Sequence, residues 1–161
     1  MFFTEDDLKD YDTLLKVYPP LRTKKDQAAL LAAIENGTVD CISSHHIPQD
    51  WDAKTIEFEY AKAGIACIET SFATIHQMLP HLPDDRIAAL FSLNARKIFS
   101  LQDASIKEGN NAELTIFNKK DTTLYTAKDS KSKSANSPFW NVSLSGKVNG
   151  TVVKGVLHLN Q

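Results

Sequence analysis

The chain has 161 residues, of which 42% are hydrophobic and 24% charged, a composition typical of a globular domain rather than of a disordered chain. Its 18 basic and 20 acidic residues leave a formal net charge of −2, so it lacks the positive field that nucleic-acid binders use. It has neither an apolar run long enough for a membrane helix nor a secretory signal pattern, so we expect a cytoplasmic protein with no nucleic-acid and no membrane partner.

The first part of the chain predicts two helices separated by an extended segment. A cluster of acidic residues resembles the first turn of a short helix from about residue 5. The Pro19-Pro20 pair stops any helix and favours an extended conformation for Tyr18. A second helix is expected from Thr23, a possible N-cap, to the Asn36-Gly37 pair.

The middle of the chain predicts one short strand and then mainly helices. Residues 38–44 are β-prone and directly follow a helix and a glycine turn, which is the order of a parallel α/β unit. Three further helices are expected, at 54–62, at 71–79 and from Asp84 onward. Asp50, Asp52 and Lys54 then read as the solvated start of the first of these helices.

From about residue 103 the sequence becomes rich in β-prone runs separated by Gly and Asn. Four such runs, at 113–117, 122–126, 142–144 and 151–157, predict a small antiparallel β module. The stretch 129–137, rich in Ser and Lys, reads as a solvated and mobile loop.

Isolated cysteines and histidines give little support for a metal or redox site. Cys41 and Cys67 lie in apolar segments without close Cys spacing, so they read as buried, reduced thiols. His76 and His81 flank a helix end near Pro80 and are expected at the surface. Adjacent His45 and His46 on a strand would point to opposite faces and could not hold one ion together.

Several motifs, in this order, resemble those of dihydroorotases in the hydantoinase-like amidohydrolase superfamily. The family's Asn-Pro-Pro-Leu-Arg corresponds to 18–22, its Gly-Thr-Ile/Val-Asp turn to 37–40, and its Asp-His-Ala-Pro-His to 45–49. Later matches are its Gly-Leu-Glu-Thr, Asn-Pro-Ala-Lys-Ile, Ala-Asp-Leu-Thr-Ile-Phe and Ser-Lys-Ser…Thr-Pro-Phe segments, at 64–70, 94–98, 112–117 and 132–139. The resemblance covers nearly the whole chain.

The resemblance implies an α/β fold: the C-terminal part of a (β/α)8 amidohydrolase barrel followed by a small antiparallel β module. Residues 1–102 would hold the last barrel strands and helices, and 103–161 the C-terminal part of the small β-sandwich domain. The remaining barrel strands would lie upstream of Met1.

The same resemblance implies a site, which this sequence departs from at three positions. His45 stands at the family's catalytic Asp, Tyr18 at its substrate-contacting Asn, and Gln49 at its substrate-carboxylate His. Backbone contacts at Ala63 and Gly64 are the part of the substrate site that could be kept. Tyr18 could instead fill the space of an unused pocket. An imidazole is neutral over much of the range in which a carboxylate is an anion, so the proton chemistry at position 45 would differ.

The family is zinc-dependent, but the ligands known for it would lie upstream, so no intact metal site and no bound zinc are expected for this chain alone. We therefore expect the C-terminal portion of a dihydroorotase-like cyclic amidohydrolase, inactive by itself, that recruits a missing N-terminal barrel portion or another copy. The alternative is a non-catalytic scaffold partner of aspartate carbamoyltransferase, which the three replacements favour. A further possibility is an unrelated ligand-binding or metal-binding module, which would need a convergent polar cluster.

Overall fold

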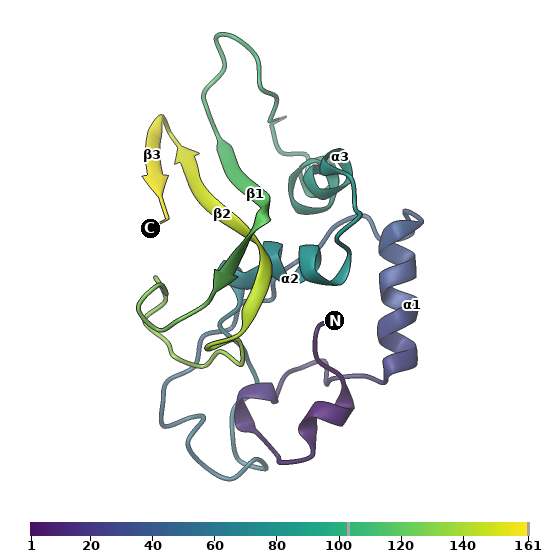
Figure 1. Ribbon diagram of the computed structural model, residues 1–161, viewed down its shortest axis with the longest axis vertical. Helices are drawn as coiled ribbons and strands as arrows, with labels where there is room; N and C mark the ends of the chain where they lie inside the picture. The colour runs from purple at the N-terminus through teal and green to yellow at the C-terminus, as the bar shows by residue number, and fades with distance from the viewer. Residues whose placement is uncertain (103, 161) are drawn as a thin grey trace.

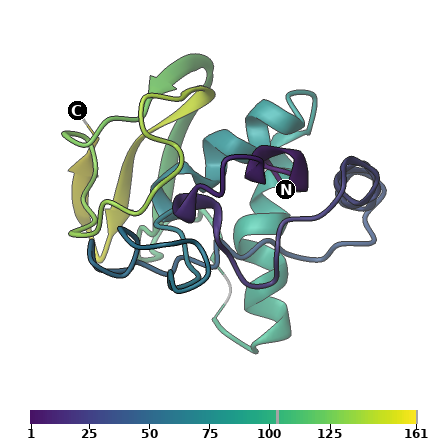
Figure 2. The ribbon, with the colours of Figure 1, turned by 90° about the horizontal axis from the view of Figure 1, so that it is seen from below.

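The computed structural model describes residues 1–102 and 104–160, in which helices and a three-stranded sheet flank a central helix. Helix α1 (Lys24–Glu35) lies on one side and the sheet on the other, with α2 (Ser71–Met78) between them (Figure 1). The view from below shows the same separation of α1 from the sheet (Figure 2). None of the helices in this described part combines the length and apolar character needed to cross a bilayer.

Helix α1 forms where the sequence predicts it because its first turn is capped by its own side chains. The Thr23 hydroxyl accepts the Asp26 N–H at 3.1 Å and donates to the Asp26 carboxylate at 2.9 Å. The helix expected from residue 5 is a single 3₁₀ turn, η1 (Glu5–Leu8), and a second 3₁₀ turn, η2 (Thr13–Leu15), follows it. The first prediction is therefore right in place and too long in extent.

The two strands expected from the barrel resemblance are not formed. Within residues 1–102 and 104–160, segments 17–22 and 38–44 have no ladder partner, and a single parallel bridge joins His46 and Ile65 nearby. A parallel strand forms when its N–H and C=O groups bond to a neighbouring strand in a regular ladder. The part of the chain that the structure describes offers these segments only isolated hydrogen bonds, such as the one from the Ile42 N–H to the Leu90 carbonyl at 2.9 Å.

The helix expected over 54–62 is also absent, and successive turns take its place. Lys54 is 5% exposed instead of solvated, because its ammonium group donates to the carbonyls of Lys62 at 2.9 Å and Lys16 at 3.4 Å. These long-range bonds draw the chain back on itself, and the β-branched pair Thr55-Ile56 disfavours a helix there. Tertiary contacts outweigh the local helix signal at this point.

The remaining helices follow the prediction closely. A 3₁₀ turn, η3 (Ile68–Thr70), leads into α2, and the helix expected from Asp84 runs as α3 (Asp84–Ala88), a π turn η4 (Ala89–Leu93) and α4 (Asn94–Ile98). Their buried side chains meet α1 in one core, made of Ile34, Ile75, Leu79, Leu82, Ile87 and Leu90.

The β module is antiparallel, as predicted, but has three strands in place of four runs. The first two runs merge into β1 (Leu114–Leu124), which pairs with β2 (Ser143–Val153) across two register irregularities. The last predicted run is split, because Lys154 and Gly155 turn the chain back into β3 (Val156–Leu159). Positive φ angles of 51° and 77° at these two residues permit the tight turn.

Helix α2 packs on β2, and this contact corrects the prediction for His76. The His76 ring is 5% exposed, lies parallel to Phe72 with 6.0 Å between ring centroids, and places Nε2 3.0 Å from the Lys119 carbonyl. Gly146 makes the approach possible, since an added Cβ would lie 2.9 Å from the His76 ring. His81, by contrast, is exposed as predicted and pairs with Glu35 at 2.6 Å.

Two further sequence predictions change in the structure. The loop 129–137 is anchored where it was expected to be solvated, since Asn136 and Ser137 are buried. Cys41 and Cys67 are free thiols as predicted, but both are half-buried and not fully buried. The predicted division into 1–102 and 103–161 begins its second part at residue 103, which lies outside the described residues, and that division stays a prediction.

Candidate functional site

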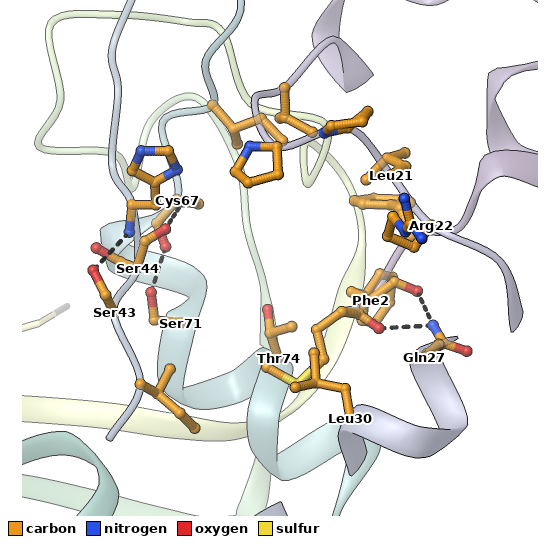
Figure 3. Close-up of a pocket in the computed structure, with 18 of the residues that line it drawn as sticks. Phe2, Leu21, Arg22, Gln27, Leu30, Ser43, Ser44, Cys67, Ser71 and Thr74 are labelled. Carbon is orange, nitrogen blue, oxygen red and sulfur yellow. Dashed lines mark hydrogen bonds between the residues drawn. The ribbon is translucent and has the colours of Figure 1, made fainter. Parts of the chain in front are cut away.

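A pocket of about 340 Å³ opens between three segments that carry the family motifs. Its walls come from residues 17–23, from 42–47 and from 64–67, and the floor is formed by α1, α2 and residues 1–3. Figure 3 shows Arg22, Gln27 and Leu30 on one side, with Ser43, Ser44 and Cys67 facing them across the opening. Apolar side chains make up most of the lining, and polar side chains such as those of Arg22, Ser43 and Thr74 lie among them.

Tyr18, His45 and Gly64 are brought together at this pocket. Tyr18 is 77% exposed, so its ring does not fill the pocket, which was one interpretation of the replacement. His45 is also exposed, has a positive φ of 49°, and donates its backbone N–H to the Ser43 hydroxyl at 3.3 Å. Both side chains stand at the rim, where a bound molecule could reach them.

His46 is turned away to a structural contact of its own. Its Nδ1 accepts the N–H groups of Cys67 at 3.1 Å and Ile68 at 3.3 Å, at the start of η3. His45 lines the pocket and His46 does not, although the strand on which this difference was expected is not formed. A ring that accepts through Nδ1 carries its proton on Nε2.

Gln49 and Ala63 contact each other and do not line the pocket. The Gln49 amide donates to the Ala63 carbonyl at 2.9 Å, so both groups are already engaged. Gly64 has a φ of +143°, and a Cβ there would lie 2.6 Å from the Ile47 carbonyl oxygen. Only glycine fits where these two segments meet. The predicted backbone contacts at 63 and 64 thus join two parts of the chain, and Gly64 alone reaches the pocket.

Several pocket residues were not singled out from the sequence. Thr70, at the end of η3, and Ser71, at the start of α2, precede Thr74 by four and three residues, a spacing that places each of them on the Thr74 side of the helix. The Thr74 hydroxyl oxygen is buried without a hydrogen-bond partner among the described residues. The spacing of Thr70 and Ser71 to Thr74 was the one available signal, and nothing in the sequence showed that this side of the helix borders a cavity.

The charged and thiol groups of the pocket are largely committed to internal contacts. Arg22 lies 3.4 Å from the Asp26 carboxylate, and hydrogen bonding from Thr23 lowers the pKa of Asp26. The Cys67 thiol donates to the Ser44 carbonyl at 3.0 Å, and burial raises its pKa. The Arg22 guanidinium is the positive charge at the rim.

These donors do not fit a zinc ion by themselves. Structural and catalytic zinc sites use at least three protein ligands from His, thiolate and carboxylate groups. No group of three such side chains comes together within 1–102 and 104–160. Of the pocket's candidate ligands, the Asp26 carboxylate caps a helix and Cys67 is a protonated thiol, which leaves His45.

Comparison with known proteins places this geometry in a family. No profile of a known protein family matches the sequence. A dihydroorotase of Acetivibrio thermocellus is 34% identical over 155 residues, covering 94% of this chain and 36% of the relative. A dihydroorotase of Clostridioides difficile is 35% identical over 162 residues, covering 98% and 38%. The chain thus spans about a third of the length of these relatives.

Solved structures show the same fold in larger enzymes. An L-hydantoinase from Arthrobacter aurescens superposes with a TM-score of 0.86 at 24% identity, over 96% of this chain and 36% of the other. A D-hydantoinase from Thermus sp. gives a TM-score of 0.81 at 22% identity, over 92% and 34%. By its sequence, the chain is therefore similar to dihydroorotases over about a third of their length, and its fold is similar to that of part of the hydantoinases.

Proposed function

We propose that the chain supplies the C-terminal portion of a dihydroorotase-like enzyme, which interconverts carbamoyl aspartate and dihydroorotate, and that it is inactive alone. The observation that carries this proposal is the relation to dihydroorotases over 94% of the chain but only 36% of the relative's length. The pocket supports it, because the segments matching the family's site motifs line one cavity.

The chemistry of ring opening explains why the chain alone would not suffice. Water adds to the ring carbonyl, the amide C–N bond breaks, and the departing nitrogen takes up a proton. Zinc would polarise the carbonyl and favour ionisation of the attacking water. Among the described residues the pocket carries no free carboxylate to move the proton, since Asp26 is held by Thr23 and Arg22.

The residues of this chain would bind and orient the substrate. Arg22 offers a positive charge at the rim to a carboxylate, as both dihydroorotate and carbamoyl aspartate are anions. The imidazole of His45, exposed at the same rim, would take the place of a carboxylate as proton carrier. The proposal therefore assigns substrate recognition and the proton carrier to this chain, and metal binding to the remaining part of the enzyme.

The decisive experiment compares the chain alone with an assembled protein. Purified residues 1–161 are assayed for zinc content and dihydroorotate hydrolysis, with and without the separately produced N-terminal portion of a related dihydroorotase. We expect no turnover from the chain alone, and turnover in the mixture that rises when His45→Asp restores the family's carboxylate. Metal-dependent ring opening by residues 1–161 with nothing added would overturn the proposal.

A second candidate function is a non-catalytic scaffold that assembles with aspartate carbamoyltransferase. The observation that favours it is the internal use of Gln49, whose amide is bonded to Ala63 and does not reach the pocket. If this second function is right, a carbamoyltransferase co-purifies with the protein, and no turnover appears even after the N-terminal portion is added. Turnover in the mixture would exclude it.

Both readings require that the chain does not remain alone. Segments 17–22 and 38–44 leave backbone groups without ladder partners, and such edges favour association. We expect size-exclusion chromatography with light scattering to give a mass above that of one 17.9 kDa chain, or a complex with the added N-terminal portion. A monomer that ignores the added portion would contradict this.

A further inference from the structure

Asn136 is a buried polar residue at the junction between the β module and the pocket. It is 4% exposed and lies in the loop between β1 and β2. Its neighbour Ser137 is fully buried, so this end of the loop is inserted into the body of the molecule. A polar side chain at such a depth needs hydrogen-bond partners.

The Asn136 side chain has all the partners that an amide can use. Its Nδ2 donates to the carbonyls of Ile47 at 3.2 Å and Gly64 at 3.1 Å. Its Oδ1 accepts the Gln49 N–H at 3.1 Å and the Ser134 hydroxyl at 2.5 Å. Two donors and both acceptor sites are occupied, which no other side chain of this size could reproduce.

These bonds join two segments that are not paired by a regular ladder. Residues 45–49 carry His45, and residues 63–66 carry Gly64, with a single bridge between the two segments. The Asn136 backbone carbonyl accepts a further bond from the Ala66 N–H at 3.0 Å. The single Ser134 hydroxyl proton is shared between Asn136 Oδ1 and the Gln49 carbonyl oxygen, which lies 2.6 Å from the Ser134 oxygen. The loop from the β module thus holds both segments at once.

We infer that Asn136 is a positioning residue for the pocket, which fixes the spacing of His45 and Gly64 through the carbonyls of Ile47 and Gly64 and the N–H of Gln49. The β module would then determine the shape of the site without contacting a bound molecule, since Asn136 does not line the pocket. The structural part of this inference stands by itself, and its consequence for substrate rests on the proposed function.

The test uses residues 1–161 and two substitutions that remove different bonds. Asn136→Leu removes all four side-chain bonds with little change in size. Asn136→Asp keeps the acceptor for Gln49 but faces two carbonyls with a carboxylate. Asn111→Ala, an exposed asparagine of the same module, is the matched control. Amide hydrogen exchange is followed residue by residue, with thermal unfolding as a measure of global stability.

For Asn136→Leu we expect protection at Ile47, Gln49 and Ala66 to fall by about tenfold or more, the effect of losing one or more buried hydrogen bonds, while β1 and β2 keep theirs. For Asn136→Asp we expect Gln49 to stay protected and Ala66 to lose protection at neutral pH. Acidification should restore it relative to wild type at the same pH, because a protonated carboxyl can donate to a carbonyl again.

Unchanged exchange at 45–49 and 63–66, or a uniform loss that includes β2, would overturn the inference. If Asn136→Leu does not fold, the pH profile of Asn136→Asp decides, because a role in packing alone would not restore protection on acidification. In the assembled enzyme we expect a higher KM for dihydroorotate with a smaller change in kcat. If no turnover appears there, the proposed function fails, while the exchange data still test the role of Asn136.

Discussion

The helix and sheet body and the pocket segments are held together in different ways. In the body, α2 packs on β2, and an apolar core joins α1, α2 and α3. Each of these elements is therefore held by several contacts at once. The pocket segments 17–23, 42–49 and 63–67 are held by individual hydrogen bonds from distant residues, such as those from the Glu5 N–H to Arg22 and from the Asn136 amide to Ile47 and Gly64. Removal of one side chain from the body should therefore lower the stability of the whole fold, whereas removal of one at the pocket should loosen only the neighbouring segments.

The largest effect is expected from Leu90→Ala in the body. Leu90 is fully buried, and deleting its side chain should cost roughly 2–5 kcal/mol through lost burial and a residual cavity. Urea unfolding measures this loss. Leu101→Ala is the control, since Leu101 is 58% exposed, and equal losses for the two variants would contradict the core described above.

Gly64→Ala should give the next largest effect, concentrated at the pocket. The positive φ of 143° alone should cost roughly 1–3 kcal/mol, and the overlap with the Ile47 carbonyl adds to it. Gly37→Ala is the matched control, because Gly37 also has a positive φ, 88°, but has no atom within 4 Å of the added Cβ. Hydrogen exchange at 45–49 should rise in the first variant only, and a rise in both would remove the steric explanation.

Tyr125→Phe tests the hydrogen bond that joins the end of β1 to Glu69 in η3. The Tyr125 hydroxyl donates to Glu69, so its removal should cost roughly 1–3 kcal/mol. Burial raises the pKa of Tyr125 to about 12, above its ordinary value of 10.0.

The raised pKa of Tyr125 makes the free energy of unfolding depend on pH in alkaline solution. Between these two pKa values the unfolded chain has lost the tyrosine proton and the folded chain keeps it, so stability present below pH 10 falls as the pH rises. The Tyr125→Phe variant should lack the part of this decrease in stability that Tyr125 causes. Parallel urea midpoints of both proteins from pH 8 to above 10 would contradict it.

The smallest effect is expected from Thr23→Ala at the start of α1. Loss of the cap should cost about 1 kcal/mol in thermal or urea unfolding. The Thr23 hydroxyl also lowers the pKa of Asp26, so its contribution is present above the ordinary carboxyl pKa and is lost as the pH falls through the folded value. The difference in unfolding free energy between wild type and Thr23→Ala should therefore become smaller in acid. A difference that stays constant with pH would contradict this account.

The sequence predicts best those elements whose partners lie within the chain. Helix α1 carries its own cap, and each strand of the sheet pairs with the next strand along the chain, so the helix and the antiparallel sheet form where they were predicted. Residues 38–44 have the composition of a parallel strand but no neighbour on either side among the described residues, so the pattern alone was insufficient. The turns at 54–62 depend on the distant carbonyl of Lys16, which no local pattern could indicate.

The candidate site was predicted in part for a similar reason. Motif matching gave Tyr18, His45 and Gly64, which do meet at one pocket. It could not show that the Gln49 side-chain amide is bonded to the Ala63 carbonyl, because that contact depends on how the two segments approach each other. Asn136 was missed because a loop rich in Ser and Lys gives no sign of being buried.

The imidazole of His76 makes the docking of α2 on the sheet directly observable. With Nε2 facing the Lys119 carbonyl, that nitrogen bears the hydrogen, and the buried Nδ1 has no partner in the described chain. A side-chain proton shielded in this way leaves slowly for solvent and should give a persistent resonance in ¹⁵N-edited magnetic-resonance spectra. Its disappearance would mark the separation of helix and sheet.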